Sequence, residues 1–382
     1  MGCGLTFAAK FGILAIWGIN GLAKRAGVLA KDGCIALTAA LAAWAFCAQP
    51  AAAGTALVFD FEDGHVLYAE DLDAPWYPAS LTKMMTAYLV FTAIREGRAT
   101  KETKIFISPD AFKQPPTRLG LKVGKDITLD QALHALIMRS ANDVAVAISE
   151  TLGGDEASFV KEMNQTAARL GMAHTHFINP HGLPAEQQVT TARDMGILAQ
   201  ALLRDFPEEA PLYAQTQATI EKVTIGTHNA LLTGFPGGDG IKTGYTCASG
   251  YNLVASATRN GRRLIAVILG ESSSNARTAR AAALLENGFR TREWKSAFPI
   301  ARVENYPSEV VGAAFEPDPL MVERFRACKA PPPPPPQTVA ASAAPAAPDA
   351  KPDAKSVVKK VSATKSSGKK TVKKKKRRQP ID

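Results

Sequence analysis

Ten consecutive residues decide the architecture to expect: Trp76-Tyr77-Pro78-Ala79-Ser80-Leu81-Thr82-Lys83-Met84-Met85. Pro78 disfavours helix just upstream, and apolar residues recur at helical spacing after Ser80, so a helix is predicted to begin near that serine. Residues i and i+3 share a helix face, which puts the Ser80 hydroxyl beside the Lys83 amine. A lysine with a lowered pKa can take the proton of a serine and make it a nucleophile. Read alone, the pair fits a helix-capping serine and a solvated lysine better.

Two further short motifs follow at long intervals. Ser140-Ala141-Asn142 lies between two helical segments, where its side chains can point into a cleft. Lys242-Thr243-Gly244 lies on a predicted strand that follows a glycine-rich turn. Each motif has a structural alternative, since Ser140 and Asn142 could cap the next helix and Lys242 and Thr243 could lie on an exposed strand edge. All three in this order are far less expected by chance than any one of them.

The secondary-structure pattern around these motifs runs strands, helices, strands, helix. An Asp-Gly turn predicts a hairpin of 55–60 with 65–69, and Asn260-Gly261 predicts a second one. Helices are predicted at 80–97, 129–137, 143–152, 157–170, 191–204 and 276–288. Further strands are predicted at 104–107, 126–128, 219–223, 241–245, 251–258 and 264–269. This order indicates an α+β domain whose antiparallel sheet takes strands from both ends of the domain.

Charge is distributed unevenly along the 382 residues. The formal net charge is +10, of which residues 1–53 carry +3 and residues 330–382 carry +10, so the body at 54–329 carries −3. A slightly acidic body gives no reason to expect specific nucleic-acid binding. The hydrophobic content of 46% is enough to bury the core of one large domain or two ordinary ones.

The first 53 residues are typical of a signal peptide. Basic residues precede an apolar run at 34–46, and three alanines at 51–53 offer a small-residue cleavage site. The run is too short to span a bilayer comfortably. An over-long start and an uncleaved anchor are the alternatives. We therefore expect the mature protein in the periplasm or on the outer face of the cytoplasmic membrane.

The mature chain would keep two cysteines, Cys247 and Cys328. An exported pair can form a disulfide, but two cysteines so far apart in sequence fit free thiols equally well. The six histidines form no convincing array of metal ligands, so neither a metal nor a cofactor is expected.

The three motifs together match the set that characterises penicillin-binding proteins and class A β-lactamases. The wider sequence closely resembles the low-molecular-mass penicillin-binding proteins that are serine-type D-alanyl-D-alanine carboxypeptidases, peptidase family S11. The resemblance covers residues 54–295 and includes three further segments: Asn179-Pro180-His181-Gly182-Leu183, Thr191-Ala192-Arg193-Asp194-Met195 and Gly250-Tyr251-Asn252-Leu253-Val254-Ala255. It implies a β-lactamase/transpeptidase-like α+β fold, an antiparallel sheet flanked by helices with an all-helical subdomain, over residues 54–300.

The resemblance also implies catalytic roles. Ser80 would attack the penultimate D-alanine of a peptidoglycan stem peptide and form an acyl-enzyme, and β-lactam inhibitors would acylate it in the same way. Lys83 would act as base, with its pKa lowered by the nearby cation of Lys242. Ser140 would relay a proton to the leaving D-alanine.

The remaining implied roles concern substrate binding. Asn142 would hold the substrate amide. Lys242 and Thr243, in the motif that ends with Gly244, would bind the terminal carboxylate, and Arg277 is a further candidate that could equally be a solvated helix arginine. The oxyanion would be held by the backbone N–H groups of Ser80 and Tyr245.

The C-terminal part departs from the resemblance. Many relatives append a β-sandwich domain, but residues 301–329 are too few for one, so we predict a short extension instead. Residues 330–382, Pro/Ala-rich and then Lys-rich, are expected to be a disordered tail. The tail could contact an anionic membrane or wall polymer by charge, or have no partner.

Three other functions are compatible with parts of the pattern. A D,D-endopeptidase would use the same residues. A β-lactamase would need a deacylating glutamate, for which Glu186 is the loop candidate. A non-catalytic protein that binds wall polymers through its tail would have no need of the three intact motifs.

Overall fold

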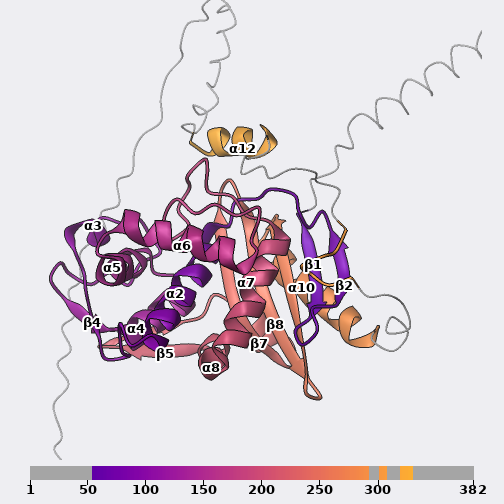
Figure 1. Ribbon diagram of the computed structural model, residues 1–382, viewed down its shortest axis with the longest axis horizontal. Helices are drawn as coiled ribbons and strands as arrows, with labels where there is room; N and C mark the ends of the chain where they lie inside the picture. Colours follow the sequence, from indigo (N-terminus) through magenta and orange to yellow (C-terminus); the bar gives the residue numbers. More distant parts are fainter. Residues whose placement is uncertain (1–53, 292–300, 308–318, 330–382) are drawn as a thin grey trace, which may run out of the picture. The chain divides into compact units, whose positions relative to one another are not determined.

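A five-stranded antiparallel sheet forms the centre of the computed structural model, which describes residues 54–291, 301–307 and 319–329. Its strand order is β2-β1-β9-β8-β7 (Figure 1). The strands are β1 (Ala56–Asp60), β2 (Val66–Glu70), β7 (Gly238–Thr246), β8 (Gly250–Arg259) and β9 (Arg262–Glu271). Strand β1 pairs with β9, which confirms that one sheet takes strands from both ends of the domain.

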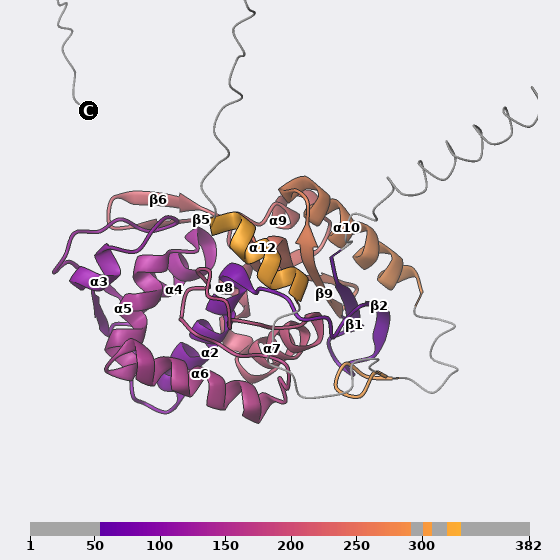
Figure 2. The same ribbon diagram turned by 90° about the horizontal axis from the view of Figure 1, so that it is seen from above.

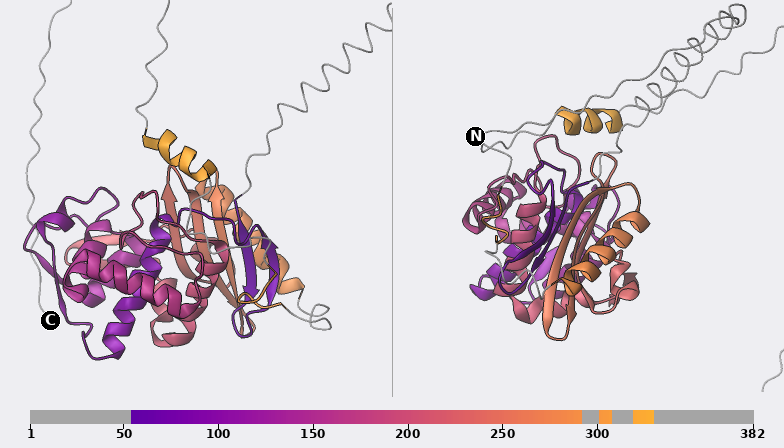
Figure 3. Two further views of the ribbon diagram at one scale, coloured as in Figure 1. Left: turned by 45° about the horizontal axis from the view of Figure 1, so that its top comes forward. Right: turned by 90° about the vertical axis from the view of Figure 1, so that its right-hand side faces the viewer.

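Both faces of the sheet are covered, because the side chains of each strand alternate between two cores. On one face, Leu253 and Ala266 pack in a smaller core with helix α10 (Ser274–Arg290). On the other face, Val254 and Val267 belong to the large core that includes α7 (Ala192–Asp205) and α2 (Lys83–Arg95). The right-hand view of Figure 3 shows α10 on one side of the sheet and most of the other helices across it. The short helix α9 (Leu231–Gly234) is on the α10 side, because its Leu231 belongs to the smaller core.

The helical layer lies beside the edge strand β7. Its buried centre is α5 (Asn142–Gly153), whose side chains from Asn142 to Ser149 are all buried. The rest of this layer is α3 (Pro109–Phe112), α4 (Leu129–His134), a π-helical turn (Ala135–Arg139), α6 (Glu156–Leu170), η3 (Pro207–Glu209) and α8 (Ala210–Ala214). Two small hairpins complete it: β3 (Lys104–Phe106) with β4 (Asp126–Thr128), and β5 (Gln217–Ile220) with β6 (Val223–Gly226).

Two predicted elements are wrong in detail. The single strand predicted at 219–223 is a hairpin, because the chain turns at Glu221, whose φ is +54°. The helix predicted at 129–137 is α4 followed by the π-helical turn, which ends at Ser140 in the left-handed conformation. The spacing of apolar residues predicts neither the turn at Glu221 nor the π-helical turn before Ser140, since both depend on backbone angles and not on which side chains are apolar.

The extension at 301–329 contains one further helix, α12 (Pro319–Lys329), in its described part. A disulfide joins Cys328 of this helix to Cys247, with 5.8 Å between the Cα atoms. The question that the sequence left open is thus answered in favour of the disulfide. Met321 and Phe325 pack in a small apolar cluster with Tyr77 and Ala248, and Figure 2 shows α12 from above.

A second attachment holds residues 301–307. Arg193 forms a buried ion pair with Asp73 at 2.6 Å and donates hydrogen bonds to the carbonyls of Val303 and Tyr306. Val303 is fully buried in the large core. The segment is therefore fixed to the body by packing and by charge-assisted hydrogen bonds.

The predicted signal peptide at 1–53 and the predicted tail at 330–382 lie outside the described residues, and the domain boundaries remain predictions. Within the described part, no helix combines the length and apolar character that crossing a membrane requires.

Candidate functional site

Ser80 is presented by a strained turn, η1 (Ala79–Thr82), that precedes α2. Ala79 has a φ of +50°, a conformation that costs a non-glycine residue about 1–3 kcal/mol and is found mainly at functional sites. The turn is clamped between two glycines. A Cβ on Gly182 would lie 1.8 Å from the Ala79 carbonyl oxygen, and one on Gly244 would lie 3.1 Å from the Ser80 nitrogen. Gly182 therefore leaves no room for a side chain next to this turn, and a side chain at Gly244 would push the turn by a few tenths of an ångström.

Lys83 lies one turn further along and is completely buried. Its Nζ is 3.1 Å from Ser80 Oγ and 2.8 Å from Asn142 Oδ1, and it also donates to the His181 carbonyl. Burial lowers the pKa of Lys83 well below its usual value, and the nearby Lys242 lowers it further. A neutral amine within hydrogen-bond distance of the serine hydroxyl can accept its proton.

Lys242 comes from the edge strand β7 and points at the second serine. Its Nζ donates to Ser140 Oγ at 3.0 Å and to the Thr243 carbonyl at 2.9 Å. Burial, assisted by the charge of Arg277, lowers the pKa of Lys242 to about 7. The left-handed conformation of Ser140 aims its hydroxyl from the helical layer toward the sheet.

Asn142 is engaged by the protein on both sides of its amide. Its Oδ1 accepts from Lys83, and its Nδ2 donates to the Pro115 carbonyl at 2.9 Å. The observed contacts show it orienting Lys83, while its predicted role in holding the substrate amide stays a prediction.

These groups open onto one cavity of about 510 Å³. Its walls include all the predicted site residues except the two buried lysines: Ser80, Ser140, Asn142, Thr243, Gly244, Tyr245 and Arg277. The three sequence motifs, far apart in the chain, are thus brought together where β7 meets the helical layer.

Arg277 reaches the cavity from α10 and is buried. Its guanidinium donates to the Asn252 carbonyl at 3.2 Å and to Ser274 Oγ at 3.0 Å. Its Nε has no hydrogen-bond partner within the described ranges. The alternative of a solvated helix arginine is therefore wrong, and a fixed guanidinium at the cavity wall is suited to a carboxylate.

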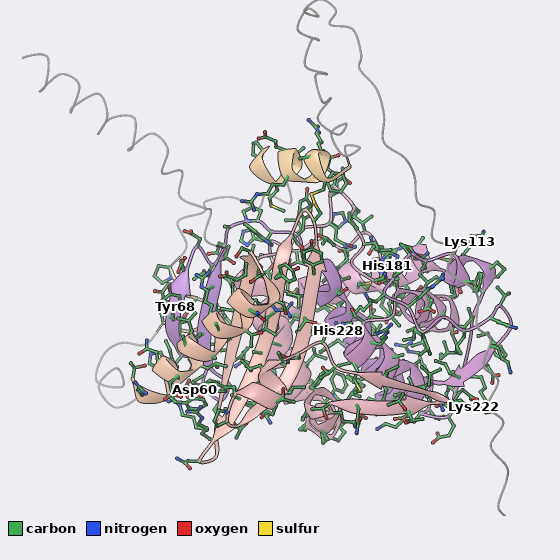
Figure 4. All side chains as sticks on the ribbon, turned by 180° about the vertical axis from the view of Figure 1, so that it is seen from behind. Asp60, Tyr68, Lys113, His181, Lys222 and His228 are labelled. Carbon is green, nitrogen blue, oxygen red and sulfur yellow. A yellow bond between two sulfur atoms is a disulfide. The ribbon has the colours of Figure 1, made fainter. Side chains whose placement is uncertain are left out.

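Some cavity residues carried no sequence signal. Two of them, His228 and Thr117, line the cavity from loops. Tyr251, which lines it from β8, lies in the segment Gly250–Ala255 that contributed to the family resemblance. Burial and the neighbouring cations lower the pKa of His228, which Figure 4 shows where the sheet meets the helical layer. His181 lies in a segment that contributed to the family resemblance. It contacts the site through its backbone carbonyl oxygen, which accepts a hydrogen bond from Lys83.

Glu186 does not line this cavity. It pairs with Arg326 of α12 at 3.7 Å, and both side chains are largely exposed. The position therefore does not suit a glutamate that activates water at Ser80. Within residues 54–291, 301–307 and 319–329, no group of three potential ligands could hold a metal ion.

The arrangement has the parts required for acyl transfer. It combines a serine hydroxyl with a neutral amine, a second hydroxyl bonded to a lysine, and a guanidinium for an anion. A substrate suited to it carries a carboxylate a short distance beyond the carbonyl that Ser80 attacks.

Comparison with known proteins gives a consistent result. The family model described as "D-alanyl-D-alanine carboxypeptidase" matches residues 44–273. The D-alanyl-D-alanine carboxypeptidase DacA of Haemophilus influenzae is 35% identical over 246 residues, 63% of each chain. The DacA of Escherichia coli is 35% identical over 262 residues, 67% of this chain and 64% of its own. The chain thus spans less than two thirds of these curated relatives.

Solved structures agree. Penicillin-binding protein 5 from Haemophilus influenzae matches with a TM-score of 0.60 and 35% identity, over 62% of this chain and 71% of its own. Penicillin-binding protein D2 from Listeria monocytogenes in its ampicillin-bound form matches with a TM-score of 0.56 and 31% identity, over 62% and 97%. The predicted β-lactamase/transpeptidase-like α+β fold is confirmed by these neighbours.

Proposed function

Because the chain belongs to the D-alanyl-D-alanine carboxypeptidases of peptidase family S11, we propose that it removes the terminal D-alanine from peptidoglycan stem peptides. The observation that carries the proposal is the position of the Lys83 amine, whose pKa burial lowers, 3.1 Å from Ser80 Oγ. Ser80 and Arg277 both line the same cavity. These groups fit a short peptide that ends in a carboxylate. The predicted domain organisation, with the catalytic domain at 54–300, is part of the proposal.

Acylation would begin with proton transfer from Ser80 to Lys83. The serine oxygen then attacks the carbonyl carbon of the penultimate D-alanine. Negative charge on the carbonyl oxygen would be held by the backbone N–H groups of Ser80 and Tyr245. Gly244 favours this arrangement, because a Cβ there would lie 3.1 Å from the Ser80 nitrogen and would push β7 away from η1.

Departure of D-alanine requires a proton on its nitrogen. Ser140 Oγ lies 3.0 Å from Lys242 Nζ and faces the same cavity, so it can pass a proton to the leaving amine. Thr243 and Arg277 would hold the carboxylate of that D-alanine. Lys242 contributes its charge through Ser140, because it is buried behind the cavity wall. The proton that Lys83 took from Ser80 passes to Ser140 and so replaces the one given to D-alanine, which leaves Lys83 neutral again. Water then hydrolyses the ester on Ser80, with Lys83 as base.

β-Lactams present an amide carbonyl and a carboxylate in one rigid molecule, so they would acylate Ser80 by the same steps. Listeria monocytogenes penicillin-binding protein D2 has been solved in ampicillin-bound and cefotaxime-bound forms. We therefore propose β-lactams as covalent inhibitors of this enzyme.

The substrate class places the enzyme outside the cytoplasm, where peptidoglycan is assembled. We propose export by the segment at 1–53 to the periplasm or the outer face of the cytoplasmic membrane. The Lys-rich tail would hold the enzyme near an anionic membrane or wall polymer through its charge. Deleting 330–382 should then reduce membrane and wall fractionation at low salt, and unchanged fractionation would exclude the tether.

The test of the proposed function is D-alanine release from a pentapeptide ending in D-Ala-D-Ala. The wild-type enzyme should release D-alanine, Ser80→Ala should not, and Ser158→Ala on the exposed face of α6 should match the wild type. Release by Ser80→Ala at the wild-type rate would overturn the assignment.

A further inference from the structure

One titratable residue of the Ser80 cavity has no part in the proposed reaction. His228 lines the cavity from the loop between β6 and α9, and it is exposed there. Figure 4 shows it at the junction of the sheet and the helical layer. Its imidazole is the kind of side chain whose charge changes most readily near neutral pH.

The loop that carries His228 is fixed on both sides of it. The next residue, Asn229, is buried, and its Nδ2 donates to the Gly240 carbonyl of β7 at 3.2 Å. The preceding residue, Thr227, donates its N–H to the Thr216 carbonyl at 2.9 Å. The imidazole is therefore presented from a held backbone, beside the strand that carries the Lys-Thr-Gly motif.

The charges that act on His228 are all positive. They come from three elements: Lys242 on β7, Arg139 at the end of the π-helical turn, and Arg277 on α10. None of the described residues that line the cavity is an aspartate or a glutamate, and apart from Arg277 the other titratable groups of the wall are two tyrosine phenols. Burial lowers the pKa of His228, and the three cations lower it further. The imidazole of the free enzyme is therefore neutral at neutral pH.

A bound carboxylate reverses this balance. The proposed substrate places its terminal carboxylate at Thr243 and Arg277, which line the same cavity as His228. A negative charge within about 4–6 Å favours the charged form of an imidazole. A carboxylate has about four acceptor sites, more than one threonine hydroxyl and one guanidinium fill. The cavity therefore has both a use for a further N–H donor and a reason for that donor to become charged.

We propose that His228 is a third contact for the terminal carboxylate of the substrate, next to Thr243 and Arg277, and that it binds this carboxylate as an imidazolium. The proton comes from solvent when the carboxylate binds and returns to solvent when D-alanine leaves, so the net reaction is unchanged. This inference rests on the proposed function, because the carboxylate is that of the stem peptide.

The pH dependence follows from the sign of the change. The pKa of His228 is higher in the complex than in the free enzyme, so its contribution to affinity is absent above both values. The contribution grows as pH falls through the pKa of the complex, and it levels off below the pKa of the free enzyme. The lowered pKa values of Lys83 and Lys242 also make the rate depend on pH. Their effects cancel when wild type and a His228 variant are compared at the same pH.

The first experiment measures D-alanine release by the full-length enzyme from a pentapeptide ending in D-Ala-D-Ala, at about pH 8 and at about pH 5.5. The KM of His228→Gln should equal that of wild type at the higher pH and exceed it about tenfold at the lower pH, the effect of losing one charge-assisted hydrogen bond. The kcat values should agree at each pH, because the carboxylate is bound alike in the ground state and the transition state.

Three controls accompany this comparison. His134→Gln removes an imidazole from α4, outside the cavity, and should match wild type at both pH values. His228→Arg keeps a positive charge at both, so its KM should be low at both. A pentapeptide with an amidated C-terminus lacks the carboxylate, and wild type and His228→Gln should hydrolyse it equally poorly at both.

A second experiment measures the proton directly and needs no turnover. The pentapeptide is titrated calorimetrically into full-length Ser80→Ala near neutral pH, in two buffers with different enthalpies of ionisation. Binding should take up a fraction of a proton from the buffer. The uptake should be absent from the double variant that also carries His228→Gln, and uptake that the double variant retains would contradict the inference.

The outcomes separate this inference from the proposed function. Release of D-alanine with the same ratio of KM values at both pH values would overturn the inference and leave the proposed function intact. Equal losses by His228→Gln on the free and the amidated pentapeptide would also overturn it, since they would indicate a displaced loop. Absence of D-alanine release by wild type at either pH would overturn the proposed function itself.

Discussion

The residues of the catalytic cavity and those of the C-terminal extension are held in place by different kinds of contact. In the cavity, Lys83 bonds to Ser80 and Asn142, and Lys242 bonds to Ser140. Thr117 joins the two groups into one network, because its hydroxyl donates to the Ser140 carbonyl and its carbonyl accepts from the Asn142 N–H. The extension is attached at separate points, chiefly Arg193 for 301–307 and the disulfide of Cys328 for α12. A network changes as a whole when one member is lost, whereas separate attachments can be removed one at a time.

The difference also concerns charge. Next to the cavity two lysines are buried, which costs folding free energy and lowers the pKa of both; the charge of Lys242 assists at Lys83, and the charge of Arg277 assists at Lys242. In the extension, Arg326 pairs with Glu186, and both of these side chains are exposed. We therefore expect variants in the cavity to change chemistry, and variants in the extension to change attachment.

The largest effect should come from Lys83→Met. Methionine fills a similar volume without an amine, so Ser80 loses its base. The second-order rate of acylation by a fluorescent penicillin should fall about 10³- to 10⁴-fold. Lys104→Met, at an exposed lysine of β3, should retain the wild-type rate. A fall of less than tenfold would show that another group takes the proton.

Arg277→Gln should have the next largest effect. Loss of a fixed guanidinium from the carboxylate site should lower kcat/KM for the pentapeptide about 10- to 100-fold. A pentapeptide with an amidated C-terminus should be hydrolysed equally poorly by variant and wild type. Arg290→Gln, exposed on the same helix, is the control. Equal losses on both substrates would indicate a structural role.

The buried charge of Lys242 predicts a pH-dependent stability. Its pKa is about 7 in the folded protein and near 10.5 when unfolded, so between these values the unfolded chain binds more protons. Stability therefore rises with pH across this window and is lost as pH falls toward 7. In urea unfolding, wild type should gain on the order of 2–4 kcal/mol relative to Lys242→Met between pH 7 and 10. A constant difference would contradict the shifted pKa.

The smallest effect on chemistry should come from Cys328→Ser. Since α12 is attached separately, penicillin acylation should stay within about twofold of wild type, while α12 opens locally and becomes sensitive to protease. Rates of acylation and of cleavage near α12 measure the two effects. Loss of acylation together with release of α12 would mean that the extension is part of the catalytic network.

The sequence predicted the cavity better than its surroundings, for physical reasons. Ser80, Ser140 and Lys242 are recognisable because each belongs to a short motif. The chemistry requires Lys83 near Ser80, Asn142 near Ser140 and Thr243 near Lys242, at fixed spacings within those motifs. The backbone features that aim them, the positive φ of Ala79 and the left-handed Ser140, leave no pattern in side-chain polarity.

The strands of the sheet were predictable from alternation and from Asn260-Gly261, whereas the β5–β6 hairpin was not. The pairing of Cys247 with Cys328 stayed open, because 81 residues separate them and only the fold brings their Cα atoms to 5.8 Å. The role of Arg277 was ambiguous for a similar reason. The sequence does not distinguish a helix arginine that faces solvent from one that faces a cavity.

The central claim is that Ser80 is the residue that becomes acylated. Its most direct test is mass spectrometry of the full-length protein after brief incubation with benzylpenicillin, followed by peptide mapping. We expect one adduct per chain, located on Ser80 in the peptide that contains η1. An adduct on Ser140 with Ser80 unmodified, or no adduct at all, would contradict it.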